Sequence, residues 1–210
     1  MPGEPETNFP RTYRGARKAF IAACQRARAD SIARVHPTAA GPNGNPLFID
    51  SVALGPRGAR KALLLIAGRD GRDGCMGSGL LAGLLDAGIH PPADARLVMI
   101  HALNPFGMAR ARCENEDGFD LDDPAAAPSW SFAMLGAILT EDLARVEKLR
   151  VLDLARGESS KISDRTAGTL ARALLAHKPG LDLRIARLAL APSNAMAQSR
   201  TVVTRALAGL

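Results

Sequence analysis

Two aspartates in a glycine-rich loop are the residues of this sequence best placed to do chemistry. The loop reads AGRDGRDGCMGSG over residues 67–79 and holds Asp70 and Asp73 three positions apart. It follows an apolar run typical of a buried strand and leads into apolar spacing typical of a helix. Carboxylates delivered to a cleft at a sheet edge can bind a metal ion or transfer protons. The glycines indicate a sharp turn, a close backbone approach, or both.

Three common ligand-binding loops do not fit the sequence. A Walker A phosphate loop requires a Gly-Lys-Ser/Thr ending, which is missing here, and the two aspartates would repel a phosphate. The stretch at 77–82 weakly imitates a dinucleotide fingerprint, but it lies too far beyond the strand, and the next strand ends in His101 instead of an acidic residue. The acidic loop at 113–128 fails as an EF-hand, because Cys113 and Pro124 stand where carboxylates are required.

Alternating strands and helices are predicted to position the loop. The predicted strands are a hairpin at 31–37 and 46–54 and later runs at 61–67, 96–103, 149–155 and 181–190. The predicted helices cover 12–29, 78–87, 129–148, a stretch through 170–175 that Asp164 could cap, and 196–208. The segment NPFG at 104–107 has the composition of a turn. This alternation predicts a layered α/β fold whose sheet is mostly parallel after the hairpin.

Composition places the chain among soluble globular proteins. Its 210 residues, 47% of them hydrophobic, are most simply one domain over 1–210. No apolar run is long enough to span a membrane, no hydrophobic signal core opens the chain, and the three cysteines lack CxxC spacing. We therefore expect a cytoplasmic protein with reduced thiols. Residues 1–35 carry seven basic and three acidic side chains, which favours a solvated arginine-rich helix over a nucleic-acid surface.

Several segments together resemble a known family. They are TYRGARKAF, HPTAAGPNGNPLFIDSVALGP, the glycine-rich loop, HALNPFG with Arg112, EDGFDLD and VLDLARG. In this order they are similar to a bacterial family of unknown function in the zinc carboxypeptidase superfamily, which includes succinylglutamate desuccinylases and aspartoacylases. The resemblance covers roughly residues 10–157. It implies a three-layer α/β fold of the carboxypeptidase type, with an N-terminal helix and hairpin before a mostly parallel sheet.

The resemblance implies that the zinc ligands have been replaced. In the superfamily the loop has the form Gly-Thr-His-Gly-x-Glu-Gly, whose His and Glu bind zinc; here Asp70 stands at the His position and Asp73 at the Glu position. The third ligand is a His in an Asp-Leu-His-Thr-Gly strand end, where this chain has Ala155. Aspartates are shorter than the residues they replace, and an alanine has no donor atom. A catalytic zinc needs three protein ligands to activate its water.

The implied substrate site is altered as well. Asn104 begins the matching Asn-Pro-x-Gly turn, and Arg112 matches an arginine that polarises the substrate carbonyl. Asp120 begins the segment that binds the substrate carboxylate, but Asp122 and Asp123 replace its Asn and Arg. Two aspartates there would repel a carboxylate. The family's catalytic glutamate has no counterpart.

We therefore expect a catalytically degenerate member of a zinc carboxypeptidase-like family, with no cofactor and a binding or regulatory role. A protein partner or a homo-oligomer would fit that role. One alternative is a metal-dependent hydrolase of the peptidase or amidohydrolase type. In it, Asp70 and Asp73, helped by Asp120, Asp122 or Asp153, would hold Mg²⁺, Mn²⁺ or Ca²⁺ weakly. Another alternative is a basic scaffold or nucleic-acid-binding protein that acts through residues 11–34.

Overall fold

A single sheet organises the computed structural model, which describes residues 9–69, 71, 73–126, 128–156, 161–164, 168–191 and 193–210. Within these residues seven strands are hydrogen-bonded in the order β1-β2-β4-β3-β5-β7-β6. The strands are β1 (Ser31–Ala40), β2 (Pro46–Leu54), β3 (Lys61–Ala67), β4 (Ala95–His101), β5 (Lys148–Arg156), β6 (Lys161–Asp164) and β7 (Asp182–Leu190).

The four middle strands are parallel, and antiparallel strands flank them on both sides. Parallel pairing joins β4 to β3, β3 to β5 and β5 to β7. The hairpin β1–β2 adds to β4, and β6 adds to β7, in antiparallel register. Every side chain of β4 is buried, as are those of β3 from Ala62 onward. Burial on both faces explains why these two strands read as continuous apolar runs.

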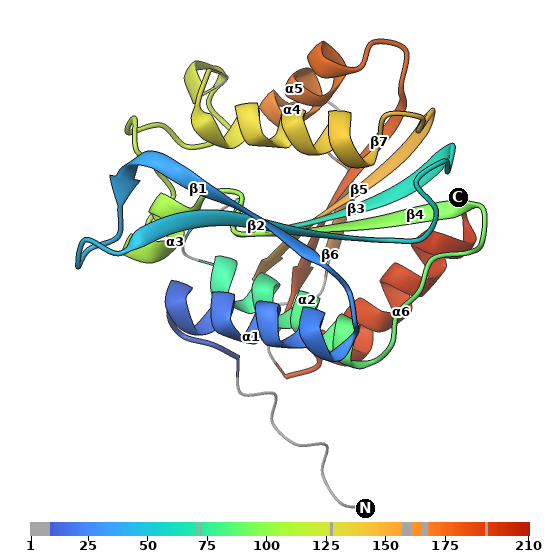
Figure 1. Cartoon of the computed structure of the whole chain (residues 1–210), viewed down its shortest axis with the longest axis horizontal. Coiled ribbons are helices and arrows are strands. Elements are labelled where there is room, and N and C mark those ends of the chain that lie inside the picture. Colours follow the sequence, from blue (N-terminus) through green and yellow to red (C-terminus); the bar gives the residue numbers. More distant parts are fainter. Residues whose placement is uncertain are drawn as a thin grey trace, which may run out of the picture.

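Helices cover both faces of the sheet. Those of the described chain are α1 (Tyr13–Arg26), α2 (Gly74–Asp86), α3 (Pro105–Arg110), the short 3₁₀ helix η1 (Pro124–Ala126), α4 (Trp130–Asp142), α5 (Thr169–His177) and α6 (Ala195–Ala208). Figure 1 shows α1, α2 and α6 on one face and α4 and α5 on the other. Leu63 and Leu65 of β3 pack toward the first group, whereas Leu64 and Ile66 pack toward the second. The predicted three-layer α/β fold is confirmed.

The N-terminal helix and hairpin lie where the sequence predicts them, and they compensate part of the positive charge of this region. Arg17 of α1 forms an ion pair with Asp50 of β2, with 2.7 Å between Nε and Oδ2. Arg26 pairs with Asp86 at the end of α2, and Arg34 of β1 pairs with Glu141 of α4. In the described chain no helix has both the length and the apolar character needed to cross a membrane.

Several boundaries differ from the prediction. The helix α2 begins at Gly74 instead of 78, and the segment NPFG opens a helix, α3, instead of forming only a turn. The helix α4 ends at Asp142 instead of 148. The backbone N–H groups of Glu147 and Lys148 donate to the Arg60 carbonyl and align the chain for β5.

The predicted capping role of Asp164 is wrong. Asp164 lies in β6, which pairs with β7, and the helix α5 begins only at Thr169 with Gly168 at its N-cap position. Long-range pairing with a neighbouring strand therefore overrides the local preference of an aspartate for a helix cap.

Candidate functional site

The loop after β3 lies at a topological switch point of the sheet. From β3 the chain crosses through α2 to β4 on one side, whereas β5 pairs with β3 on the other side. Connections that leave in opposite directions open a crevice at the carboxyl ends of parallel strands, which is where α/β proteins bind ligands. The sequence-predicted site therefore lies at the position that the topology favours.

Two positions of this loop, Gly68 and Gly71, have no room for any residue other than glycine. Gly68 has a φ of +67°, and a Cβ there would lie 2.8 Å from Cα of Ala102. A Cβ at Gly71 would lie 2.1 Å from the carbonyl oxygen of Arg112 and 2.3 Å from the carbonyl carbon of Gly107. The loop thus both turns sharply and packs its backbone against the segment that follows β4.

Asn104 ties that segment to the loop. Its backbone N–H donates to the Gly68 carbonyl at 2.7 Å. The side-chain Oδ1 accepts from the Gly107 N–H, and Nδ2 donates to the Cys113 carbonyl at 2.8 Å. The side chain is fully buried. Both ends of this amide are engaged by backbone groups, so Asn104 holds the architecture of the site together.

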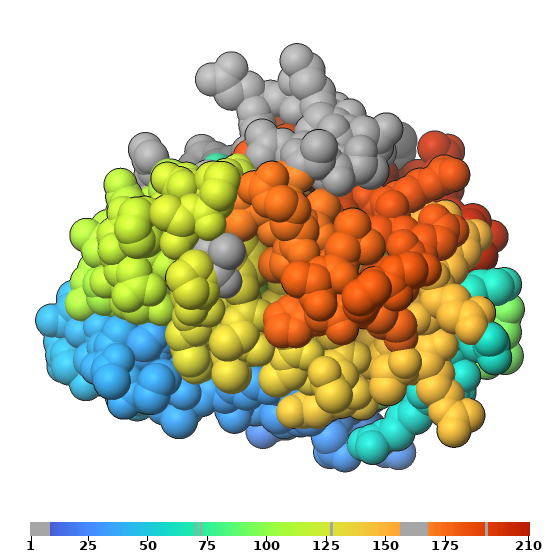
Figure 2. Space-filling model, turned by 90° about the horizontal axis from the view of Figure 1, so that it is seen from above, coloured from blue at the N-terminus to red at the C-terminus, as the bar shows by residue number. Residues whose placement is uncertain are grey.

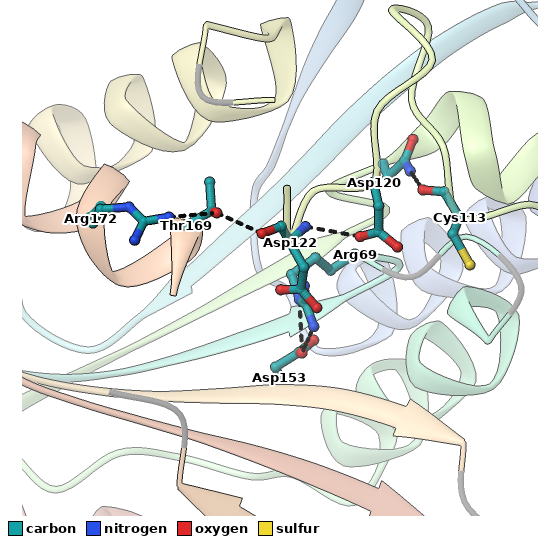
Figure 3. A network of polar contacts seen from close by, with 8 residues as sticks. Arg69, Cys113, Asp120, Asp122, Asp153, Thr169 and Arg172 are labelled. Atoms are coloured by element: carbon teal, nitrogen blue, oxygen red, sulfur yellow. Dashed lines mark hydrogen bonds and ion pairs between the residues drawn. The ribbon is translucent and has the colours of Figure 1, made fainter. Parts of the chain in front are cut away.

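A buried arginine occupies the centre of the site (Figure 3). Arg69, the first residue after Gly68, donates from Nε to Oδ2 of Asp153 at 2.9 Å, and its second terminal nitrogen lies 2.8 Å from the same oxygen. Its other terminal nitrogen contacts Oδ1 of Asp122 at 2.5 Å. Burial opposes the charged form, but the charges and hydrogen bonds of Asp153 and Asp122 outweigh it and raise the pKa of Arg69. The guanidinium is charged at every physiological pH.

The backbone of Asp122 is fixed from two sides. Its N–H donates to Oδ1 of Asp120 at 2.9 Å, and its carbonyl accepts from the Thr169 hydroxyl at 2.8 Å. Arg172, one turn further along α5, donates to the same hydroxyl. These contacts hold the acidic loop against the start of α5, and Figure 2 shows the loop and the helix side by side on the surface. The Asp122 side chain therefore reaches Arg69 from a fixed backbone.

A row of alternating charges crosses the sheet at this edge. Asp153 of β5 is the register partner of Arg187 of β7, so the two side chains are neighbours on the face covered by α4 and α5. Arg69 approaches Asp153 from the end of β3. These three residues and Asp122 line a pocket of about 280 Å³. Among the described residues, Gly168, Leu170, Ala171 and Ile185 also line it.

Asp73, Ala155 and Asp123, which the sequence also singled out, are not among the residues that line this pocket. Asp70 lies outside the described residues. Asp73 is half-buried at the N-cap position of α2, and Ala155 is a buried residue of β5, one position beyond Leu154, the register partner of Ala67. Asp123 is exposed, and its Oδ1 accepts from the N–H of Ala125 in η1.

Arg112 is exposed and does not line the pocket. Its guanidinium lies 4.8 Å from the centre of the Phe106 ring, over which Arg110 also stacks at 3.9 Å. The backbone of Arg112, and not its side chain, contacts the glycine-rich loop, because the Arg112 carbonyl oxygen packs against Gly71. Arg112 therefore matches the family in sequence position only, because its side chain lies against Phe106 and not in the pocket.

The expectation that Asp122 and Asp123 repel carboxylates stays a prediction, and it did not take Arg69 into account. The Asp122 charge is compensated by the guanidinium, and Asp123 faces solvent outside the pocket. Sequence reasoning matched Arg69 to a threonine of the family pattern and assigned it no role. The signal was present, since Asp153 stands between Leu152 and Leu154 in a predicted strand and a buried aspartate needs a counter-charge.

The described residues do not fit the three-ligand zinc site that the resemblance implies. Ala155 offers a methyl group at one ligand position. The carboxylates of Asp153 and Asp122 already share a fixed cation, which would repel a metal ion placed beside it. Among the described residues no group of three or more histidine, cysteine, aspartate or glutamate side chains is arranged to hold a metal ion.

A serine–histidine pair lies in the core away from this site. The Ser78 hydroxyl is 2.7 Å from Nδ1 of His101, and both residues are fully buried. The imidazole stacks between the rings of Tyr13 and Phe20, and burial lowers its pKa to about 3. A substrate cannot reach this fully buried pair, so it belongs to the packing of α1 and α2 on β4.

Comparison with solved structures shows which fold this is. A metallo-carboxypeptidase from Burkholderia cenocepacia is similar with a TM-score of 0.57 at 14% identity, over 85% of this chain and 60% of its own. An aspartoacylase family protein from Mesorhizobium loti has a TM-score of 0.53 at 16% identity, over 82% of this chain and 65% of its own. This chain thus spans less than two thirds of either protein, and at these identities the likeness concerns the fold.

The search of curated proteins found no match to the chain. The fold likeness confirms the resemblance to zinc carboxypeptidases and aspartoacylases that the loop, the Asn-Pro-x-Gly segment and the strand ends indicate in the sequence. A family model described as "Protein of unknown function (DUF2817)" matches residues 9–123, more than half of the 210 residues, and the chain belongs to that family.

Proposed function

We propose that this protein is a catalytically inactive member of the carboxypeptidase-like fold and that it binds a small molecule without hydrolysing it. The observation that carries the proposal is the position of Arg69. Its guanidinium joins Asp153 of β5 to Asp122 of the acidic loop at the carboxyl end of β3. In the superfamily that region binds the metal and the substrate.

The donor set argues against hydrolysis in two independent ways. Ala155 removes one of the three protein ligands that a hydrolytic zinc requires, and no shift of the backbone can give a methyl group a donor atom. Arg69 supplies a permanent positive charge, and Asp153 and Asp122 serve as its counter-ions. A weakly held Mg²⁺ or Mn²⁺ would have to compete with this guanidinium for the same oxygens.

A binding role is supported by what remains at the site. The pocket of about 280 Å³ lies at the switch point and combines charged groups with an apolar wall. Ligand pockets typically have this composition, with a few polar groups that fix orientation against apolar surroundings. A protein partner or self-association, which the loss of catalysis led us to expect, stays a prediction, as does a cytoplasmic location.

The test combines metal analysis with activity assays on the full chain. We expect elemental analysis of the untagged protein to find far less than one zinc per chain. We also expect no hydrolysis of C-terminal peptide bonds or N-acyl amino acids when Zn²⁺, Mg²⁺ or Mn²⁺ is added. A metallo-carboxypeptidase assayed in parallel serves as the positive control. One tightly bound metal ion per chain, or turnover that a chelator abolishes, would overturn the proposal.

A further inference from the structure

We propose that two copies of this chain form a twofold-symmetric dimer in which β1 of one copy pairs antiparallel with β1 of the other. The two sheets then join into one. This inference goes beyond the proposed function and does not depend on it. It rests on the outer edge of β1 and on the charges along that strand.

The outer edge of β1 is open in the described part of the chain. β1 is the terminal strand of the sheet and pairs with β2 on one side only. Its register with β2 is regular from Ser31 to Val35, and the irregularity follows between Val35 and Ala40. Pro37, which cannot donate to a ladder, also lies beyond the regular part. Residues 31–35 therefore present a row of backbone N–H and C=O groups with which one more strand can pair.

The two most exposed large hydrophobic side chains of the described chain lie on this edge. Val35 is 54% exposed and Ile32 is 44% exposed. Arg34 reaches Glu141 of α4, so the alternation of a strand places Ile32 on the α4 face and Val35 on the opposite face. A further strand alongside β1 covers both side chains at once, whereas in a monomer both stay in contact with water.

The charges on either side of Ile32 indicate that the further strand is a second copy of β1. Asp30 precedes Ile32 by two positions and Arg34 follows it by two, so extended backbone carries all three toward the same face. A twofold axis that passes between Ile32 and its own copy sets Asp30 of each chain opposite Arg34 of the other. The isoleucines meet at the centre, and an opposite-charge pair lies on each side of them. A strand with this pattern is complementary to itself.

Neighbouring registers lose this match. Opposed residues of an antiparallel pair share a face, so the axis can pass only between a residue and its own copy. An axis at Ala33 sets Ile32 against the guanidinium of Arg34, and an axis at Ser31 sets it against the carboxylate of Asp30. An axis at Arg34 sets two guanidinium groups against each other. The charges therefore select the register centred on Ile32.

Arg34 keeps its own contacts in such a dimer. Nη1 donates to the Ser51 hydroxyl at 2.9 Å, and Nη2 contacts Glu141. A guanidinium has five N–H donors, so these contacts leave donors for a second carboxylate. Asp30 is exposed, and its side chain makes no hydrogen bond or ion pair to another described residue. Its carboxylate is therefore available to Arg34 of the second copy.

Dimer formation leaves the pocket beside Arg69 untouched. β2 and β4 separate β1 from β3, and the pocket lies on the far side of β3, toward α5 and β7. Figure 2 shows the blue hairpin segment and the orange α5 apart on the surface, with the acidic loop and α4 between them. A chain that forms no dimer would therefore overturn this inference and leave the proposed function as it stands.

Sedimentation equilibrium of the full chain over a series of concentrations tests for the dimer. We expect the apparent mass to rise with concentration from that of one chain to that of two. Ile32→Lys should weaken association by at least about tenfold, because it places two ammonium groups at the axis. Leu175→Lys makes the same change at an exposed hydrophobic residue of α5 and should leave association unchanged. A wild-type chain that stays monomeric up to millimolar concentration would overturn the inference, as would a dimer that Ile32→Lys leaves intact.

Oxidative cross-linking tests the register. Ile32→Cys should form a disulfide-linked dimer, because directly opposed residues of an antiparallel pair have Cα atoms about 4.5–5.5 Å apart, within the range for a disulfide. Val35→Cys changes a more exposed side chain, but Val35 opposes Ala29 in this register and lies about 20 Å from its own copy. The wild type, with its own three cysteines, shows the background. Equal cross-linking of the two variants would contradict the register.

A charge reversal tests the pairing of Asp30 with Arg34. Asp30→Lys should weaken the dimer by about tenfold or more, since it sets a lysine against an arginine at both ends of the strand pair. Asp94→Lys reverses an exposed aspartate before β4 and should have no effect. Circular dichroism and thermal unfolding show whether each variant is folded. A dissociation constant that is the same in folded Asp30→Lys and in wild type would contradict the charge complementarity on which the choice of a second copy rests.

Discussion

Arg69 and Asp153 form a buried ion pair that links the end of β3 to the neighbouring parallel strand β5. Two nitrogens of the guanidinium lie 2.9 and 2.8 Å from Oδ2 of Asp153, and the two side chains are 4% and 6% exposed. Asp122 reaches the third nitrogen from a loop 53 residues away in the sequence. The centre of this site is therefore a guanidinium with two counter-ions.

Removing the guanidinium should destabilise the fold strongly. Arg69→Met leaves the buried Asp153 without its cation, and breaking a buried pair in this way costs about 3–5 kcal/mol of unfolding free energy. Urea denaturation measures the loss. Arg60→Met is the matched control, because Arg60 pairs with Glu147 on the surface and both side chains are largely exposed. If Arg69→Met lowers the free energy of unfolding no more than Arg60→Met does, the Arg69–Asp153 pair does not stabilise the fold.

Restoring zinc ligands should work well only when Arg69 is removed too. The triple variant Asp70→His, Asp73→Glu and Ala155→His rebuilds the family's ligand types, but the fixed positive charge of Arg69 opposes a metal ion beside it. Adding Arg69→Thr, the residue of the family pattern, should raise zinc affinity by at least about tenfold. Zinc titration by calorimetry compares the two variants.

No turnover is expected from either variant, because the catalytic glutamate of the family has no counterpart in this sequence. Two results would contradict the role given to Arg69: the same zinc affinity in the triple and quadruple variants, or tighter binding in the triple variant. Far-UV circular dichroism with and without zinc shows whether each protein is folded during the titration.

The buried His101 should make the protein sensitive to mild acid. Burial, with a smaller effect of the nearby Arg17 charge, lowers the pKa of His101 to about 3 in the folded chain, from 6.5 for a free histidine. Below pH 6.5 the unfolded chain binds a proton that the folded chain does not, so stability falls as pH decreases from 6.5 toward 3. Between pH 6.5 and 5 the contribution amounts to about 2 kcal/mol.

Denaturation of variants at pH 7 and pH 5 measures how much of the acid sensitivity comes from His101. His101→Gln should lose less stability than wild type between the two pH values, by about 2 kcal/mol. His90→Gln, which changes an exposed histidine, should follow wild type. An acid sensitivity that persists unchanged in His101→Gln would mean that other groups cause it.

Gly71 should tolerate no side chain. Its hypothetical Cβ lies 2.1 Å from the Arg112 carbonyl oxygen and 2.6 Å from the Met108 nitrogen, both of them backbone atoms that cannot rotate away. We expect Gly71→Ala to lower the thermal midpoint clearly and to weaken ligand binding in the pocket, because the loop that carries Arg69 must shift. Gly58→Ala is the control, since nothing lies within 4 Å of the added methyl group. Equal midpoints for the two variants would show that the loop has room to move.

Much of the fold could be predicted from the sequence because its signals are local. The apolar runs at Lys61–Ala67 and Ala95–His101 contain few polar residues, and that pattern requires burial on both faces. The turn between β1 and β2 is rich in glycine, proline and asparagine, which favours a hairpin. Capping by Asp164 failed as a prediction because a strand pair with β7 formed there, and strand pairing depends on residues far away in the sequence.

The site was only partly predictable. Resemblance to a family pointed to the loop after β3 and to the ends of neighbouring strands, but it gave weight to each residue according to the chemistry of the family. Arg69 was therefore overlooked, and Arg187, outside the matched segments, carried no signal at all. Arg112 and Asp123 match the family in position, yet their side chains lie outside the pocket.

The sequence by itself determined that this chain builds a three-layer α/β fold and that a glycine-rich turn stands at the end of a central strand. Apolar periodicity and the steric demands of glycine act over a few residues, so they can be read along the chain. Only the tertiary structure decided what the turn holds. Arg69 contacts Asp153, 84 positions away, and Asp122, 53 positions away. Ion pairs depend on distance in space, and that distance is set by the order in which the strands pair in the sheet.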